Sequence, residues 1–328
     1  MPKIITVTFN PALDKSIFIA NLVPDKKLKC SQPVYEPGGG GINVARAIKK
    51  LGGDAIAIYL SGGEAGKKIT SLLNEELIAT VPIDINEGTR ENLIVADTAH
   101  DKQYLFDMPG PVVSEQEWQE CLATIKEMPD VAYIIASGSL PAGVPVDIFA
   151  KVAVIAREKG AKLIVDTAGE ALKLAVEAGV YLIKSNIREL ASLVDKETLT
   201  ISEVADVAKT VVSKGNCEAM VISMGPHGAM LVTNRMILHI KPPVLHIEGT
   251  VGAGDSLVAG IILSLSEDKS LTEAVQYGVA CGSAATMHPG TELCIKADVE
   301  TIYTSIRNNA RQPKVFFNQG YLQKTGSE

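Results

Sequence analysis

Short, continuously apolar runs alternate with segments of helical periodicity in the second half of the chain. The apolar runs are at residues 131–136, 161–165, 181–183 and 219–223. The helical patterns lie between them, at residues 146–159, 170–178 and 202–214. A strand that is apolar on both faces is typical of a parallel sheet with helices on either side. This half of the chain is therefore predicted to form βαβ units.

The first half of the chain contains two kinds of strand pattern. Residues 4–9 and 55–60 are predicted to be buried strands, and residues 42–48 and 67–77 helices. Residues 16–19, 92–96 and 103–108 instead alternate between apolar and polar side chains. That alternation favours an antiparallel sheet with one face in water. We therefore predict an α/β fold with a mainly parallel central sheet and a small antiparallel β-sheet lid.

The same patterns divide the chain into regions. One domain is expected over residues 1–310, with the lid formed by about residues 14–36 and 88–110. Residues 311–328 are polar and are expected to form a loosely held C-terminal tail.

The most informative stretch is the run EGTVGAGDS at residues 248–256. Residues 244–247 before it alternate like a strand, and residues 257–265 after it are apolar and compatible with a helix. A glycine-rich turn that opens a helix presents free backbone N–H groups, and these bind anions. Asp255 at such a turn suits a base that accepts a proton from a hydroxyl attacking a phosphorus atom. The alternative is a tight turn in which Asp255 is an ordinary first-turn acid.

Polar side chains follow several of the predicted strands. They are Asp14, the triplet at 137–139, Asp166, the segment at 184–189 and the segment at 225–228. Ligands bind at the carboxyl ends of the strands in parallel α/β sheets. We therefore expect these residues to share one cleft with the turn at 248–256.

Composition narrows the classes of function. The chain has 328 residues, with 31 Lys and Arg against 38 Asp and Glu, a formal net charge of −7. That balance favours neither nucleic acid nor an acidic membrane surface as a partner. The five cysteines show no C-x-x-C spacing, and no signal peptide or long apolar segment is present, so we expect a cytoplasmic protein with reduced thiols. Serine-hydrolase and zinc-hydrolase motifs are also absent.

Three motifs together resemble those of one family. The run PGGGGINVAR at 37–46 resembles the first signature of the ribokinase-like (PfkB) sugar kinases, and GTVGAGDS at 249–256 resembles the second. NIRE at 186–189 is similar to the N-x-x-E motif that positions magnesium through water. The likeness covers residues 6 to about 307 and is strongest to the hexose-phosphate branch. It implies a three-layer αβα fold with a lid.

The resemblance also implies a role for individual residues. The catalytic group would be Asp255 as base, with the N–H groups of Gly252, Ala253 and Gly254 around the transferring phosphoryl group. The sugar phosphate would be bound by Asp14, Lys27, Gly39, Asn43, Arg90 and Ser139, with Lys29 beside Lys27. ATP would be bound by Lys184, Asn186, Ser223, Gly225, Gly228, Thr250 and Ser283. Glu189 and Asn186 would organise Mg²⁺ through water, and K⁺ would bind near Gly249, Val251, Ala285 and Gly290. Because Asp255 adjoins a helix N-terminus, we expect it to be a weak base.

The implied reaction is ATP-dependent phosphorylation of the 1-hydroxyl of fructose 6-phosphate. Tagatose 6-phosphate and fructose 1-phosphate are alternative substrates, but kinases for these usually carry Lys where this chain has Gly40. A catalytically silent sugar-phosphate sensor is the alternative from another class. Intact Asp255, Asn186 and Glu189 argue against it, since a sensor needs neither base nor metal organiser. The resemblance further implies a homodimer formed through the lid, with Leu93, Val95, Leu105 and Phe106 as its exposed apolar positions.

Overall fold

The structure is a computed structural model, which describes residues 2–288 and 292–309. Its main element is a nine-stranded sheet in the order β13-β12-β11-β10-β9-β8-β1-β4-β5. The seven parallel strands are β1 (Lys3–Thr8), β4 (Ile56–Ser61), β5 (Ala79–Asp84), β8 (Val131–Ser137), β9 (Lys162–Asp166), β10 (Val180–Asn186) and β11 (Cys217–Ser223). Two antiparallel strands, β12 (Ala229–Thr233) and β13 (Ile237–Ile240), complete one edge.

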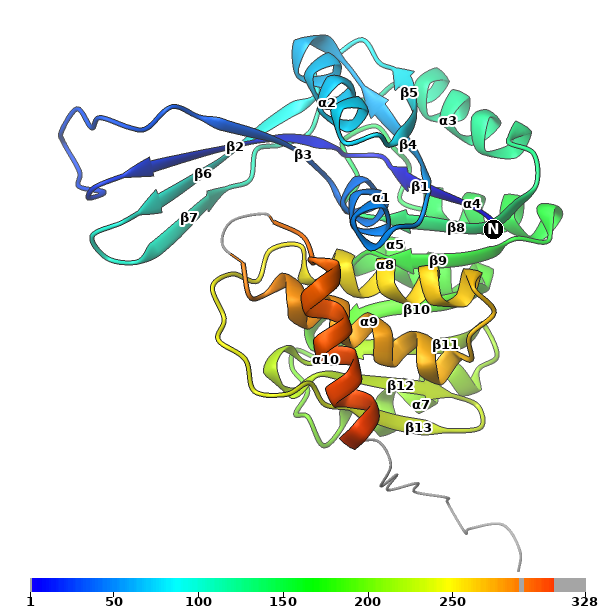
Figure 1. Ribbon diagram of the computed structural model, residues 1–328. Helices are drawn as coiled ribbons and strands as arrows, with labels where there is room; N and C mark the ends of the chain where they lie inside the picture. The colour runs from blue at the N-terminus through cyan, green and yellow to red at the C-terminus, as the bar shows by residue number, and fades with distance from the viewer. Residues whose placement is uncertain (1, 289–291, 310–328) are drawn as a thin grey trace, which may run out of the picture.

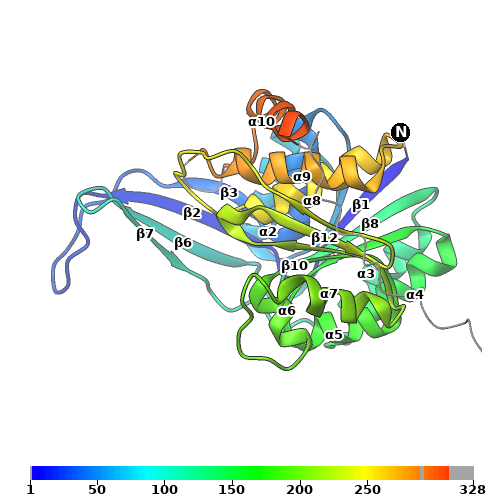
Figure 2. The ribbon, with the colours of Figure 1, turned by 90° about the horizontal axis from the view of Figure 1, so that it is seen from below.

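Helices cover both faces of this sheet, and Figure 2 shows α8, α9 and α10 on the side opposite α3 to α7. The first face packs against α1 (Gly40–Leu51), α2 (Gly63–Glu75), α8 (Ala253–Ser266), α9 (Leu271–Ala285) and α10 (Lys296–Asn309). The second packs against α3 (Glu115–Glu127), α4 (Ile148–Lys159), α5 (Gly169–Ala178), α6 (Ile187–Leu193) and α7 (Val204–Ser213). Each face has its own buried core, so along β1 Ile4 belongs to one core while Ile5 and Val7 belong to the other. The predicted three-layer α/β architecture is confirmed.

A second, four-stranded sheet projects from one end of the main domain (Figure 1). It consists of β2 (Ala12–Ile19), β3 (Val34–Gly38), β6 (Arg90–Asp97) and β7 (Lys102–Phe106), in the order β3-β2-β6-β7. We call this sheet and its loops the lid. Its two outer pairs are antiparallel, whereas the central β2–β6 pair is parallel. The central pair is parallel because β2 and β6 both leave the main sheet in the same direction, after β1 and β5.

The lid exposes apolar side chains, but not all of those expected. Leu105 and Phe106 on β7 are 55% and 45% exposed, as predicted. Val95 is only 5% exposed and Leu93 is half-buried, so the prediction of exposure is wrong for Val95. Val95 lies on an inner strand, flanked by β2 and β7, where neighbouring side chains cover it.

The predicted strand at residues 244–247 is also wrong. β13 ends at Ile240, and the chain then runs without regular structure to the start of α8. Pro242 and Pro243 explain this, because proline has no N–H to donate to a strand ladder. The expected C-terminal tail at 311–328 lies outside the described residues. Among the helices that the structure describes, none is long and apolar enough to cross a membrane.

Candidate active site

The glycine-rich turn lies at the start of α8, at the carboxyl edge of the parallel sheet. Gly252 is the N-cap of α8 and has φ of 74°, the left-handed region that glycine adopts without strain. A Cβ at this position would lie 2.7 Å from Leu293 Cδ2, so glycine is also required for space. The first N–H groups of α8 have no partner within the helix and point away from it. The turn therefore has the geometry of an anion seat.

Asp255 lies in the first turn of α8, beside this seat. Its Oδ2 accepts a hydrogen bond from Asn43 Nδ2 on α1 at 3.0 Å, which links the two glycine-rich segments across 212 residues of chain. Burial, and then the nearby charge of Asp166, raise the pKa of Asp255 to about 6, although Asn43 and Lys184 oppose the rise. The expectation of a weak base is therefore wrong. Desolvation of the carboxylate outweighs the effect of the helix N-terminus.

Lys184, at the end of β10, brings a positive charge to the same place. Its Nζ is 3.0 Å from Asp166 Oδ2, and both side chains are about 90% buried. Burial by itself lowers the pKa of Lys184. The negative charges of Asp166, Glu189 and Asp255 raise it by more than burial lowers it, so the pKa of Lys184 is raised overall. A Cβ at Gly254 would lie 2.8 Å from Lys184 Nζ. Glycine at 254 thus lets the ammonium group reach the start of α8.

Asp166 is a site residue to which the motifs assigned no role. It is the last residue of β9, and its position at a strand end is what placed it in the shared cleft in the sequence analysis. Beside it, Asn186 and Glu189 form a capping box at the start of α6. Asn186 N donates to Glu189 Oε2 at 2.8 Å, and Asn186 Nδ2 donates to Glu189 Oε1 at 2.7 Å. Burial raises the pKa of Glu189.

The glycine run at 38–41 forms the opposite wall of the site. Gly39 is the N-cap of α1 with φ of 116°, and a Cβ at Gly40 would lie 2.2 Å from Ser137 Oγ. A cavity of about 490 Å³ lies in front of these residues and is also lined by Ser139, Asp166, Glu189 and Asp255. Both glycine-rich segments therefore face one cavity.

The lid adds further polar groups. A Cβ at Gly38 would lie 2.3 Å from Asp14 Oδ2, and Asp14 Oδ1 accepts from Asn92 Nδ2 at 2.9 Å. Burial raises the pKa of Asp14. Arg90 is nearly buried at the base of the lid, whereas Lys27 and Lys29 are exposed in the 20–33 loop. The structure brings Arg90, but not these lysines, into contact with the rest of the site.

The remaining predicted nucleotide residues lie on the other side of Lys184. Ser223 ends β11 opposite Asn186, and its Oγ donates to Ser185 O at 3.3 Å. Gly225 and Gly228 flank a short 3₁₀ turn, η1 (Gly225–His227). A Cβ at Gly228 would lie 2.0 Å from Ile240 O, so this backbone approach requires glycine.

The end of α9 lies against the segment that leads into the seat. Glu248 N and Gly249 N donate to Thr286 O at 2.9 and 3.3 Å. Thr286 Oγ1 in turn donates to Ser283 O at 2.7 Å. These bonds bring the residues predicted to bind K⁺ at 249, 251 and 285, together with Thr250 and Ser283, into one region. Gly290 lies outside the described residues.

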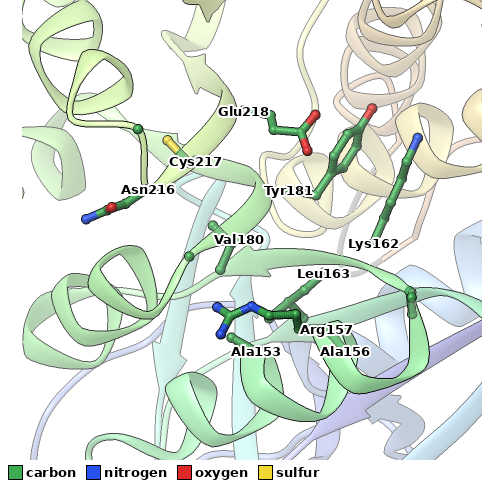
Figure 3. A pocket seen from close by; sticks show the side chains of 14 residues that line it. Ala153, Ala156, Arg157, Lys162, Leu163, Val180, Tyr181, Asn216, Cys217 and Glu218 are labelled. Atoms are coloured by element: carbon green, nitrogen blue, oxygen red, sulfur yellow. The ribbon is translucent and has the colours of Figure 1, made fainter.

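A second cavity, of about 440 Å³, lies at the opposite edge of the sheet, where β9, β10 and β11 begin (Figure 3). Arg157 donates there to Ala178 O at the end of α5, and Lys162 Nζ lies 4.5 Å from the centre of the Tyr181 ring. The helices α4, α5 and α7 all end at this edge, and helix C-termini repel anions. The helix ends at this cavity therefore oppose anion binding, although Arg157 and Lys162 line it.

Comparison with known proteins gives consistent results. The pfkB family carbohydrate kinase profile matches residues 7–298. ATP-dependent 6-phosphofructokinase isozyme 2 of Escherichia coli is 41% identical over 304 residues, which are 92% of this chain and 98% of that protein. The 1-phosphofructokinase of Bacillus subtilis is 30% identical over 88% of this chain and 95% of its own length.

Crystal structures of Escherichia coli phosphofructokinase-2 share the fold. Those with potassium and with fructose-6-phosphate match at TM-scores of 0.91 and 0.88 and at 40% and 39% identity. Each match covers 94% of this chain and 100% of the other. A structure of the tetrameric inhibited form matches at a TM-score of 0.89 and 40% identity, over the same shares.

Proposed function

The chain belongs to the pfkB family of carbohydrate kinases, and from that premise we propose that it transfers the γ-phosphoryl group of ATP to the 1-hydroxyl of fructose 6-phosphate. The observation that carries the proposal is the position of Asp255, with its pKa raised to about 6, directly beside the anion seat. The 41% identity to a 6-phosphofructokinase, against 30% to a 1-phosphofructokinase, supports the choice of substrate.

Asp255 is the proposed base. Its pKa of about 6 leaves it ionised at neutral pH but makes it more basic than an ordinary aspartate. The hydrogen bond from Asn43 orients the carboxylate, which accepts the proton of the attacking 1-hydroxyl. The N–H groups of Gly252, Ala253 and Gly254, together with Lys184, stabilise the charge on the transferring phosphoryl group. A loose phosphoryl-transfer transition state depends mainly on this positioning.

The charged side chains around Lys184 bear on how ATP and Mg²⁺ would bind. Three carboxylates, of Asp166, Glu189 and Asp255, surround the single ammonium group of Lys184. In the described part of the chain no group of three acidic, histidine or cysteine side chains forms a metal site. Mg²⁺ binds through few carboxylates and through substrate phosphates, and it neutralises phosphate charge during transfer. The family implies ATP as the nucleotide, and Glu189 and Asn186 would hold the Mg²⁺ that accompanies its phosphates.

A K⁺ site near Gly249, Val251 and Ala285 is also part of the proposal. Backbone carbonyls of these residues would be the ligands there. The hydrogen bonds from Glu248 and Gly249 to Thr286 O hold the two segments together. The similar Escherichia coli enzyme has a crystal structure with potassium. His288 Nε2 lies within hydrogen-bond distance of Asp298 Oδ2, at 2.9 Å, beside this region.

Gly40 favours fructose 6-phosphate over the alternative substrates. A Cβ at this position would lie 2.2 Å from Ser137 Oγ and 3.0 Å from Gly138 N. The lysine that 1-phosphofructokinases and tagatose-6-phosphate kinases usually carry here therefore does not fit without a shift of this wall. In this chain, which has no lysine at position 40, the residues proposed to bind the sugar are Asp14, Gly39, Asn43 and Ser139.

We also propose a homodimer formed through the lid. Phe18, Val34, Leu105 and Phe106 are each between 45% and 55% exposed on this sheet. A projecting sheet with exposed apolar side chains is covered most simply by a second copy around a two-fold axis.

A panel of sugar phosphates with Mg-ATP tests the proposed function. We expect the highest kcat/KM with fructose 6-phosphate, and lower values with tagatose 6-phosphate and fructose 1-phosphate. A higher value with fructose 1-phosphate would transfer the assignment to the 1-phosphofructokinases. No turnover with any sugar phosphate, together with tight binding of one, would instead support the sensor.

A further inference from the structure

Arg90 stands at the start of β6, where the lid leaves the main domain. Its side chain is only 10% exposed. Nη1 donates to the carboxylate of Asp107 and to Met108 O at 3.0 Å, and Nη2 donates to Asn10 O at 3.2 Å. Nε is buried and has no partner among the described residues. The guanidinium group is therefore held by three hydrogen bonds, which leave two of its five N–H donors, that of Nε and one of Nη2, for another acceptor.

Asp107 differs from Arg90 in its surroundings. It follows β7, and its side chain is 76% exposed. In the described ranges, 2–288 and 292–309, its only ion-pair partner is Arg90. The exposed Asp107 carboxylate can return to water at small cost, whereas the nearly buried Arg90 needs another anion in its place, which a substrate phosphate supplies.

The Arg90–Asp107 pair adjoins the sugar side of the proposed site. Asn92 Nδ2 donates to Asp14 Oδ1 at 2.9 Å, and Asn92 Oδ1 accepts from Met108 N at 3.1 Å. Asp14 and Asn92 are opposite each other in the β2–β6 register, and Arg90, two residues before Asn92, is on the same face of β6. Asn92 thus connects the segment that carries Asp107 to a proposed sugar ligand.

Resting on the proposed function, we propose that Asp107 limits the affinity for the sugar phosphate, because it competes with the 6-phosphate of the substrate for Arg90. A phosphate that binds Arg90 must either displace the Asp107 carboxylate or lie beside it, and both weaken binding. Asp107 touches neither the base nor the phosphoryl seat. Its effect therefore falls equally on the bound substrate, the transition state and the bisphosphate product.

The test is Asp107→Asn, which keeps the shape of the side chain and removes its charge. We expect the KM for fructose 6-phosphate to fall about two- to fivefold, the range for an ion pair of this exposure, with kcat and the KM for Mg-ATP unchanged. Calorimetric titration with fructose 6-phosphate, without nucleotide, should show the same fold decrease in Kd. Asp101→Asn is the matched control, because Asp101 is an exposed lid carboxylate with no ion pair among the described residues.

A second background tests whether the effect acts through Arg90. In an Arg90→Ala chain, Asp107→Asn should give no decrease in KM beyond that of Asp101→Asn. An increased or unchanged KM in the single variant would overturn the inference, and an increase would mean that Asp107 orients Arg90 for the phosphate. If the unmodified chain neither phosphorylates nor binds any sugar phosphate, the proposed function itself fails. That outcome is distinct from a failure of the inference about Asp107.

Discussion

Replacement of Asp255 by Asn should abolish most of the activity and yet stabilise the protein. The two side chains have nearly the same shape, and an amide oxygen still accepts the hydrogen bond that Asn43 donates. What changes is the charge. The ordinary pKa of an aspartate is 3.8, and the environment of Asp255 raises it to about 6. At neutral pH the folded protein therefore holds Asp255 in its ionised form, although the surroundings of this side chain disfavour the negative charge.

The size of the gain follows from this difference. Each pH unit between folded and unfolded pKa values corresponds to about 1.4 kcal/mol, so about two units give at most about 3 kcal/mol. Because Asp255 is only partly buried, a net gain of about 1–2 kcal/mol is more realistic. The destabilisation is present above the folded pKa and disappears toward the unfolded pKa. The advantage of Asp255→Asn should therefore be full above about pH 6 and lost near pH 4.

Thermal unfolding and steady-state kinetics measure the two effects. At pH 7.5 we expect Tm to rise by about 2–4 °C, while kcat falls about 10²- to 10⁴-fold. The matched control is Asp206→Asn, an exposed acid in the first turn of α7, which should lose a little stability because it loses a favourable interaction with the helix N-terminus. If Asp255→Asn lowers Tm as the control does and keeps more than a third of kcat, Asp255 is an ordinary first-turn acid.

Three other changes test the rest of the site. Arg90→Ala should raise the KM for fructose 6-phosphate about 10- to 150-fold, with little change for ATP, because charge-assisted contacts are worth about 1.5–3 kcal/mol; equal weakening of both ligands would place its role in the fold. Gly40→Ala should raise the sugar-phosphate KM by forcing Ser137 aside, and adding Ser137→Ala should recover part of the loss. An unchanged KM for Gly40→Ala would remove the steric argument for specificity. Sedimentation equilibrium should show a homodimer at assay concentrations that Leu105→Asp dissociates, whereas a fully active monomer would exclude lid pairing.

Much of the main domain could be predicted from the sequence because its strands are buried on both faces. Runs such as 131–136 and 219–223 differ from β8 and β11 by no more than two residues at either end. Once parallel strands are placed, geometry alone brings their carboxyl ends together. This is why Asp14, Lys184 and the turn before α8 could be assigned to one cleft before any contact was known.

The predictions that failed have both local and tertiary causes. The strand expected at 244–247 has the correct alternation, but the two prolines before it prevent pairing. The parallel pairing of β2 with β6 depends on where each strand leaves the main sheet, which a local pattern does not record. β5 was not predicted because it is a largely exposed edge strand that contains Pro82. The prolines at 82, 242 and 243 are local signals that the apolar pattern does not record, whereas the β2–β6 pairing is set by the tertiary arrangement.

The pKa of Asp255 shows the same limit at the scale of one side chain. Its sequence position, in the first turn of a helix, lowers the pKa of a carboxylate. Its surroundings raise it, first because burial in the cleft disfavours the charged carboxylate and then because Asp166 brings a second negative charge from β9. The raised value in turn makes the proposed chemistry work at neutral pH, since a base with a pKa of about 6 holds a transferred proton better than an ordinary aspartate does. The motif therefore supplies the residue, while burial in the cleft and the charge of Asp166 set its basicity, so a transplanted motif without that burial and that neighbour would carry a weaker base.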